Sequence, residues 1–134
     1  MTVTRFAPSP TGNLHLGHAY SALYSERVAR GNGGKFLLRI EDIDYTRCRS
    51  EYIKGIYDDL EWLGINWEGD VVIQSSRLDL YKETANKLKA MGLLYPCFCT
   101  RKDIAKSTER TASNGDAIYS GKCLHLTEEE LSLI

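Results

Sequence analysis

The chain has 134 residues, of which 43% are hydrophobic and 26% charged, and these values are typical of one soluble globular domain. Its 17 basic and 18 acidic side chains give a net charge of −1 and are spread evenly, so a nucleic-acid partner would have to bind a local surface. We find no signal-peptide pattern and no apolar run near the ~20 residues that span a membrane, and therefore expect a cytoplasmic protein.

The first 42 residues predict a strand, a helix and a second strand. Residues 2–8 (TVTRFAP) and 35–42 (KFLLRIED) have strand patterns, and residues 14–31 have a helical one. The expected core face of this helix comprises Leu16, Ala19, Tyr20, Leu23 and Val28. A strand, a helix and a strand in so short a segment indicate a parallel βαβ unit with a right-handed crossover.

The middle of the chain predicts two more helices and a short strand. Residues 50–64 form an amphipathic helix and residues 70–74 a strand. Residues 76–92 form the next helix, which Ser76 and Asp79 begin as a capping box. The expected core-facing residues of the two helices are Ile53, Ile56, Tyr57, Leu60, Leu63, Tyr81, Ala85 and Leu88. Most tyrosines and tryptophans are likewise expected in the core.

The last residues predict the beginning of a further helix. Residues 126–134 (LTEEELSLI) contain a possible capping box of Thr127 and Glu130, and the chain stops soon after it. Because natural domains rarely end where a helix has just nucleated, we expect the chain to be the front part of a longer protein.

The segment RFAPSPTGNLHLGH, residues 5–18, joins the first strand to the first helix. Open α/β folds bind ligands at this edge of the sheet, where a helix N-terminus favours phosphate. His15 and His18 flank Gly17, whose missing side chain lets a ligand approach, and their imidazoles can donate hydrogen bonds to phosphate oxygens. The segment has neither a G-x-G-x-x-G pattern nor a Walker lysine, so it matches neither of those phosphate-binding loops.

Three of the four cysteines are grouped late in the sequence, at Cys97, Cys99 and Cys123. Cytoplasmic cysteines stay reduced, so a metal site is favoured over disulfides. A Cys-x-Cys pair with a third cysteine after a short polar loop is typical of a structural zinc site, and three unliganded cysteines are the alternative. Cys48 lies outside this group.

These segments together resemble the class I aminoacyl-tRNA synthetases, in their glutamyl and glutaminyl branch. The similarity covers nearly the whole chain, in one order, through APSPTGNLHLGHA, LRIEDID, LEWLGINWEGD, QSSRLDLY and YPCFCTR. It implies an α/β fold, the first half of a Rossmann-like parallel sheet with the start of a zinc-bearing insertion. The implied domains are residues 1–95 of the catalytic domain, a zinc-binding insertion at 96–126, and a truncated next element at 127–134.

Within the branch, the chain looks most like the glutamyl-Q tRNA(Asp) synthetases, which lack the anticodon-binding domain. The resemblance rests on Ile43, where ordinary glutamyl synthetases usually have threonine, and on the insertion that ends at Cys123. It implies ATP-dependent formation of glutamyl-adenylate without tRNA, then transfer of glutamate to the queuosine base of tRNA(Asp), by a monomer. The alternatives are an ordinary glutamyl synthetase that charges tRNA(Glu), and an inactive module that binds zinc, nucleotide or RNA. The module remains open because no Lys-Met-Ser-Lys-Ser-type loop occurs.

The resemblance also implies residue roles. The glutamate-binding set is Arg5, Phe6, Ala7, Pro8, Ser9 and Glu41. Arg5 binds the side-chain carboxylate of glutamate, which suits a guanidinium, and Glu41 binds its amino group. His15, Gly17 and His18 bind ATP, brought with Mg²⁺, and the two histidines stabilise the transition state at the α-phosphate. Asp42 and Asp44 are expected to cap the following turn.

For zinc, the resemblance adds Tyr119 to Cys97, Cys99 and Cys123 as the fourth ligand of one structural ion. A phenolate is an unusual ligand, but a metal lowers the pKa of the groups that bind it. His125 is the competing fourth ligand, because a Cys-x-His pattern occurs here in some ordinary glutamyl synthetases.

Overall fold

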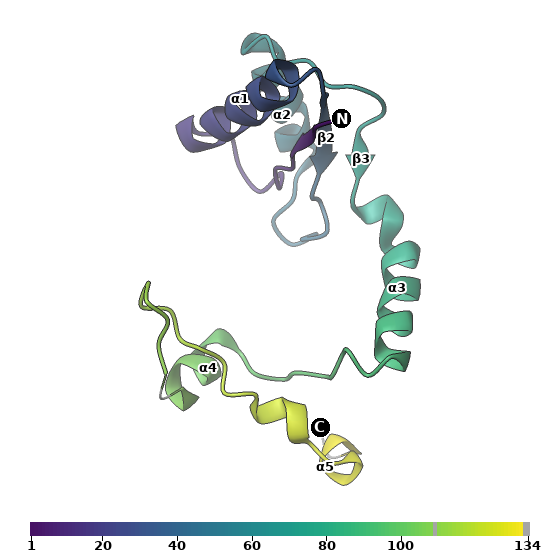
Figure 1. Cartoon of the computed structure of the whole chain (residues 1–134), viewed down its shortest axis with the longest axis vertical. Coiled ribbons are helices and arrows are strands. Elements are labelled where there is room, and N and C mark those ends of the chain that lie inside the picture. The colour runs from purple at the N-terminus through teal and green to yellow at the C-terminus, as the bar shows by residue number, and fades with distance from the viewer. Residues whose placement is uncertain (109, 133–134) are drawn as a thin grey trace. The chain divides into compact units, whose positions relative to one another are not determined.

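Three strands of the first half of the chain form a parallel sheet in the order β1-β2-β3 (Figure 1). They appear in a computed structural model that describes residues 1–108 and 110–132. The chain divides into two units, Met1–Leu80 and the residues from Tyr81 onward. No helix in the described ranges is both long and apolar enough to cross a membrane.

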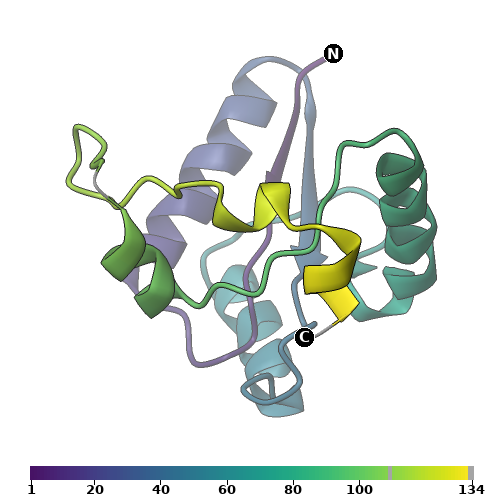
Figure 2. The same ribbon diagram turned by 90° about the horizontal axis from the view of Figure 1, so that it is seen from below.

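The predicted βαβ unit is confirmed, with slightly shorter elements. It comprises β1 (Val3–Phe6), α1 (Leu16–Gly31) and β2 (Lys35–Ile40). Val3 pairs with Lys35 and Phe6 with Leu38, and the two strands lie side by side in Figure 2. The return into β2 requires Gly34, because a Cβ there would lie 2.0 Å from the Thr2 carbonyl oxygen.

Side chains of β2 alternate between a core face and an open face. Phe36, Leu38 and Ile40 are buried and pack with Phe6 of β1. Lys35 and Leu37 are exposed on the opposite face, and Arg39 shares that face.

The predicted core face of α1 is wrong. Ala22 and Ala29 are completely buried, whereas Leu16 is 86% and Tyr20 68% exposed. The small alanine side chains let the helix backbone approach the sheet closely, and the larger apolar residues lie on other faces of the helix. The expectation that most aromatic residues are buried fails in the same way, since Trp62 is 86% exposed.

The amphipathic stripe of α2 (Ser50–Trp62) is confirmed. Ile56 and Leu60 are buried, and Ile53, Tyr57 and Leu63 pack against the same core. After this helix the chain returns to β2 through Glu68, which accepts a 2.7 Å hydrogen bond from the Phe36 N–H and donates its own N–H to the Phe36 carbonyl. The carboxylate of Glu68 therefore satisfies the backbone N–H of a buried strand residue.

Beyond β3 (Val72–Ile73) the structure differs from the prediction. A short 3₁₀ turn, η1 (Ser75–Arg77), precedes α3 (Leu78–Ala90), so the expected capping box does not form. The Ser76 hydroxyl instead donates to the Ile73 carbonyl. No described residue of α3 is buried, and Ala85, expected in the core, is exposed.

The second unit contains short elements: α4 (Arg101–Ser107), a 3₁₀ turn η2 (Lys122–His125) and α5 (Glu128–Ser132). The prediction from sequence missed α4, although Thr100 and Asp103 form a capping box at its start. The predicted capping contacts between Thr127 and Glu130 are present. The last two residues of the predicted final helix, 133–134, lie outside the described residues.

Candidate functional site

His15 and His18 lie at the N-terminus of α1, and His15 is the N-cap residue. The Nδ1 atom of His15 accepts a 3.1 Å hydrogen bond from the Gly17 N–H, and that of His18 accepts one of 3.2 Å from the His15 N–H. The two rings are stacked, with centroids 3.8 Å apart. The histidines therefore cap the helix that they begin.

This capping determines which ring nitrogens can act on a ligand. An Nδ1 that accepts a backbone N–H carries no proton, so the neutral imidazole carries its proton on Nε2 and can donate from there. Burial, and secondly the charge of His15, lower the pKa of His18 and favour its neutral form. The pair therefore has Nε2–H donors at the positive end of the helix dipole, a combination that suits phosphate oxygens.

Gly17 makes room for the His15 ring. A Cβ at this position would lie 3.1 Å from His15 Cε1 and 3.2 Å from its Nδ1, closer than an ordinary carbon contact of about 3.5–4.0 Å. The position of the His15 ring therefore favours glycine at residue 17, in addition to the ligand access that the sequence suggested.

A pocket of about 650 Å³ joins these histidines to the end of β1. Its lining includes Arg5, Phe6, Ala7, Pro8 and Ser9 together with His15 and His18. The structure therefore brings the predicted glutamate segment and the predicted ATP histidines to one cavity. Glu41 and Gly17 are not among the described residues that line it.

Glu41 adjoins this pocket through Arg5. Its carboxylate oxygen Oε1 lies 3.8 Å from Arg5 Nη1 and accepts a hydrogen bond from Arg39 Nη2. The Glu41 N–H donates to the Pro8 carbonyl over 2.9 Å, which fixes the end of β2 to the loop after β1. Arg39 was not a predicted site residue, and only its position two residues before Glu41 in a strand could have indicated it.

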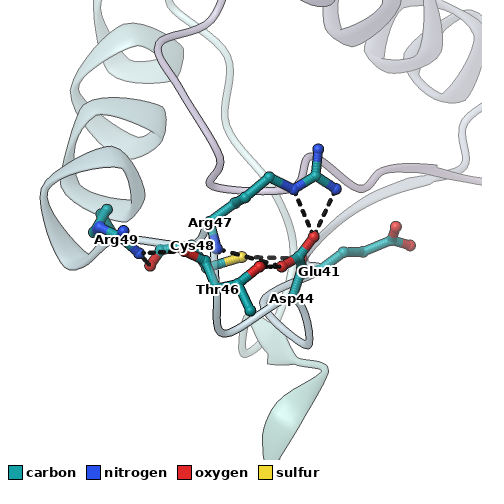
Figure 3. A network of polar contacts seen from close by, with 6 residues as sticks. All are labelled: Glu41, Asp44, Thr46, Arg47, Cys48 and Arg49. Carbon is teal, nitrogen blue, oxygen red and sulfur yellow. Dashed lines mark hydrogen bonds and ion pairs between the residues drawn. The ribbon is translucent and has the colours of Figure 1, made fainter.

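The loop from Glu41 to Arg49 is held by its own polar contacts (Figure 3). Asp44 accepts hydrogen bonds from the Thr46 hydroxyl at 2.6 Å and from Arg47 Nε at 2.7 Å. These bonds, first that of Thr46, lower the pKa of Asp44 to about 2. Figure 3 shows the Glu41 side chain pointing away from this pair. Asp44 thus caps the following turn, as predicted.

The same prediction is wrong for Asp42. Its carboxylate accepts hydrogen bonds from the Ser75 N–H (2.8 Å) and hydroxyl (2.6 Å), so it connects the end of β2 to η1. Burial alone would raise the pKa of Asp42, but the bonds from Ser75 outweigh it and lower the pKa. A partner 33 residues away cannot be found by reading local turn patterns.

The sulfur atoms of Cys97, Cys99 and Cys123 all lie within 4.8 Å of one another. The Tyr119 hydroxyl is 3.4 Å from Cys97 Sγ and 3.8 Å from Cys99 Sγ. His125 is not a member of this group among the described residues. The structure therefore brings together the three predicted cysteines and Tyr119.

The donor chemistry of this cluster fits zinc. Tetrahedral Zn²⁺ with Zn–S bonds of ~2.3 Å separates its sulfur ligands by roughly 3.8 Å, and Cys99 and Cys123 are 3.5 Å apart. Hydrogen bonds, first that from Tyr119, lower the pKa of Cys123 to about 7, which favours the thiolate that a metal needs. Hydrogen bonding to Cys123 first, and then to Cys97, raises the pKa of Tyr119, so the phenol is protonated unless a metal binds it.

Comparison with known proteins identifies the family. Residues 1–133 match the family described as tRNA synthetases class I (E and Q), catalytic domain. The chain is 51% identical over 125 residues to the glutamate–tRNA ligase of Aquifex aeolicus, covering 92% of this chain and 26% of that protein. It is 48% identical over 126 residues to the glutamyl-Q tRNA(Asp) synthetase of Rhodobacter capsulatus, covering 90% of this chain and 45% of that protein.

A solved structure gives the same fold. The glutamate tRNA ligase from Elizabethkingia meningosepticum, solved in complex with its amino acid, matches with a TM-score of 0.73 and 32% identity. The match covers 98% of this chain and 29% of that one. The chain thus spans between about a quarter and a half of the length of these relatives.

Proposed function

The chain belongs to the class I tRNA synthetases for glutamate and glutamine, and from this membership we propose that the protein activates glutamate with ATP. The observation that carries the proposal is the single pocket that holds Arg5–Ser9 together with His15 and His18. A site for glutamate and a site for phosphate must adjoin if an amino acid is to be adenylated. The fold is accordingly that of a Rossmann-like synthetase catalytic domain.

In the proposed reaction, the α-carboxylate oxygen of glutamate attacks the α-phosphorus of ATP. A new O–P bond forms, the bond to the β-phosphate oxygen breaks, and pyrophosphate leaves with that electron pair. The Nε2–H groups of His15 and His18 donate to phosphate oxygens whose negative charge grows in the transition state. Removing either donor should slow adenylate formation by about 10²- to 10³-fold.

We propose that glutamate lies against the end of β1. Arg5 pairs with its side-chain carboxylate, because a guanidinium can bind both carboxylate oxygens at once. Glu41 accepts hydrogen bonds from its ammonium group, and Phe6, Ala7, Pro8 and Ser9 line the same pocket. Gly17 belongs to the ATP site through the position of His15. ATP binds with Mg²⁺, to which we assign no residue.

For the acceptor, we propose the queuosine base of tRNA(Asp). Support comes from Ile43, from the cysteine cluster, and from a 48% identical relative that carries this activity in its name. Relatives named glutamate–tRNA ligase are as similar, with up to 51% identity among those compared, so charging of tRNA(Glu) is the second candidate.

Glutamate-dependent exchange of pyrophosphate into ATP separates these candidates. The assay uses the full product of the reading frame, first without tRNA and then with tRNA(Glu) or queuosine-containing tRNA(Asp). Exchange without tRNA supports the proposed function. Exchange that appears only after tRNA(Glu) is added replaces it with the ordinary synthetase. A protein that binds zinc but exchanges nothing in any mixture is a binding module.

We also propose that residues 96–126 form a structural zinc insertion. Cys97, Cys99, Cys123 and Tyr119 would hold one Zn²⁺, whose bonds would tie together segments that otherwise share little buried surface. Metal analysis of the purified protein should find about one zinc per chain. Replacing Tyr119 by Phe should weaken zinc binding, and replacing His125 by Ala should not. The reverse result would make His125 the fourth ligand.

A further inference from the structure

Among the described residues, Arg39 makes the shortest side-chain contact with the carboxylate of Glu41. The reaction proposed above assigns no role to Arg39. Its Nη2 donates a hydrogen bond to Glu41 Oε1. Its Nε is buried and has no hydrogen-bond partner among the described residues. An arginine with an unpaired buried N–H contributes little to the stability of the fold. A role in the site therefore explains the presence of Arg39 better than a role in stability does.

Strand geometry places three charged groups on the open face of the sheet. Arg39 and Glu41 are two residues apart at the end of β2, so their side chains share a face opposite to that of Ile40. Arg5 of β1 is in register with Leu37, which lies on that face. The three side chains are partly exposed, at 49% for Arg5, 28% for Arg39 and 29% for Glu41.

Both arginines contact the same oxygen of Glu41, but unequally. Arg39 makes a hydrogen bond to Oε1, whereas Arg5 Nη1 stays 3.8 Å away, beyond hydrogen-bond distance. No hydrogen bond to Glu41 Oε2 is present within the described part of the chain. Arg39 therefore takes the close contact, and both Arg5 and one oxygen of Glu41 remain available.

We propose that Arg39 is a positioning residue that holds Glu41 and thereby leaves Arg5 free for the side-chain carboxylate of the substrate. This inference rests on the proposed binding of glutamate. Without Arg39, Arg5 and Glu41 would neutralise each other directly. With Arg39, the three groups carry a net charge of +1, which complements the −1 charge of glutamate at neutral pH and does not complement neutral glutamine.

The test compares Arg39→Gln and Arg39→Lys with the wild-type full-length protein. Arg39→Gln removes the charge, and Arg39→Lys keeps the charge but lacks the guanidinium fork. The matched control is Arg30→Gln, which breaks an arginine–glutamate pair, Arg30 with Glu26, on α1. Each protein is assayed by pyrophosphate exchange at varied glutamate and varied ATP, and by calorimetric titration with glutamate and with glutamine.

Arg39→Gln should raise the KM and Kd for glutamate by about 10- to 100-fold, the effect of losing one charged hydrogen bond. The KM for ATP should stay within about twofold, and the preference for glutamate over glutamine should fall. Arg39→Lys should restore part of the affinity for glutamate and part of that preference. The control should match wild type. An unchanged glutamate KM in Arg39→Gln overturns the inference. So does an equal change in both KM values with a lower melting temperature, which indicates a structural role.

Failure of the proposed function gives a different result. If the wild-type protein binds glutamate but exchanges no pyrophosphate, the adenylation proposal fails, and the calorimetric comparison of the Arg39 variants still decides this inference. If the wild-type protein does not bind glutamate at all, both proposals are overturned.

Discussion

Replacing Gly17 by alanine should reduce catalysis while leaving stability nearly unchanged. The added methyl would lie 3.1 Å from His15 Cε1, about half an ångström inside ordinary contact, so the ring must move. That movement weakens the 3.1 Å hydrogen bond from the Gly17 N–H, which costs about 1 kcal/mol. Alanine has a higher helix propensity than glycine by up to ~1 kcal/mol, which offsets the loss.

The catalytic effect has no such compensation. The Nε2–H of His15 must lie within hydrogen-bond distance of the α-phosphate, and a misplaced group can cost up to ~10²-fold in rate. We expect Gly17→Ala to lower the rate of adenylate formation by about 10- to 100-fold, measured by pyrophosphate exchange, with an unfolding free energy within ~1 kcal/mol of wild type.

The control for this prediction is Gly31→Ala, at the other end of the same helix. A Cβ at Gly31 meets nothing within 4 Å, so this variant should keep full activity. A Gly17→Ala protein with the wild-type rate would show that the His15 ring need not occupy the observed position, and would refute the reasoning.

Three further predictions concern stability, pH and metal. Leu60→Ala empties a completely buried position and should lower the unfolding free energy by about 2–5 kcal/mol in urea titrations, whereas Trp62→Ala, at a position 86% exposed, should change it little. Asp44 should titrate with a midpoint near pH 2 by NMR. Because its pKa in the folded protein is depressed, its stabilising contribution is present above the unfolded pKa of about 4 and is lost as the pH falls through 2. A midpoint near pH 4 would contradict the Thr46 and Arg47 contacts. Chelation of zinc should expose residues 96–126 to protease while the first unit stays protected. Cys123→Ser should be cleaved like the chelated protein, and Cys48→Ser like the wild type. Equal cleavage with and without chelator would refute a structural metal.

Local sequence patterns predicted the elements better than their packing. The apolar spacing of residues 50–64 identified α2 and its buried stripe, because Ile56 and Leu60 are the side chains that the sheet covers. The same reasoning chose the wrong face of α1. Hydrophobic size indicates which residues could be buried, but the close approach of a helix to a sheet favours alanine, as Ala22 and Ala29 show.

The candidate site divides in the same way. His15, Gly17 and His18 could be found from sequence because their spacing and their place between a strand and a helix are local features. The tyrosine in the cysteine cluster was found only through family resemblance, since nothing in its spacing marks a hydroxyl that lies 3.4 Å from Cys97. Arg39 was missed because its position two residues before Glu41 places both side chains on one face of the strand but does not show that they pair.

By itself, the sequence determined the order of the strands and helices from β1 to α3, and the chemical groups available at the end of β1 and the start of α1. These features depend on neighbours along the chain. Only the tertiary structure decided that Glu41 lies between Arg5 and Arg39, that Asp42 binds Ser75, and that alanines cover the sheet. Those contacts depend on the register of parallel strands, which joins residues far apart in sequence and is set by the packing of the whole core.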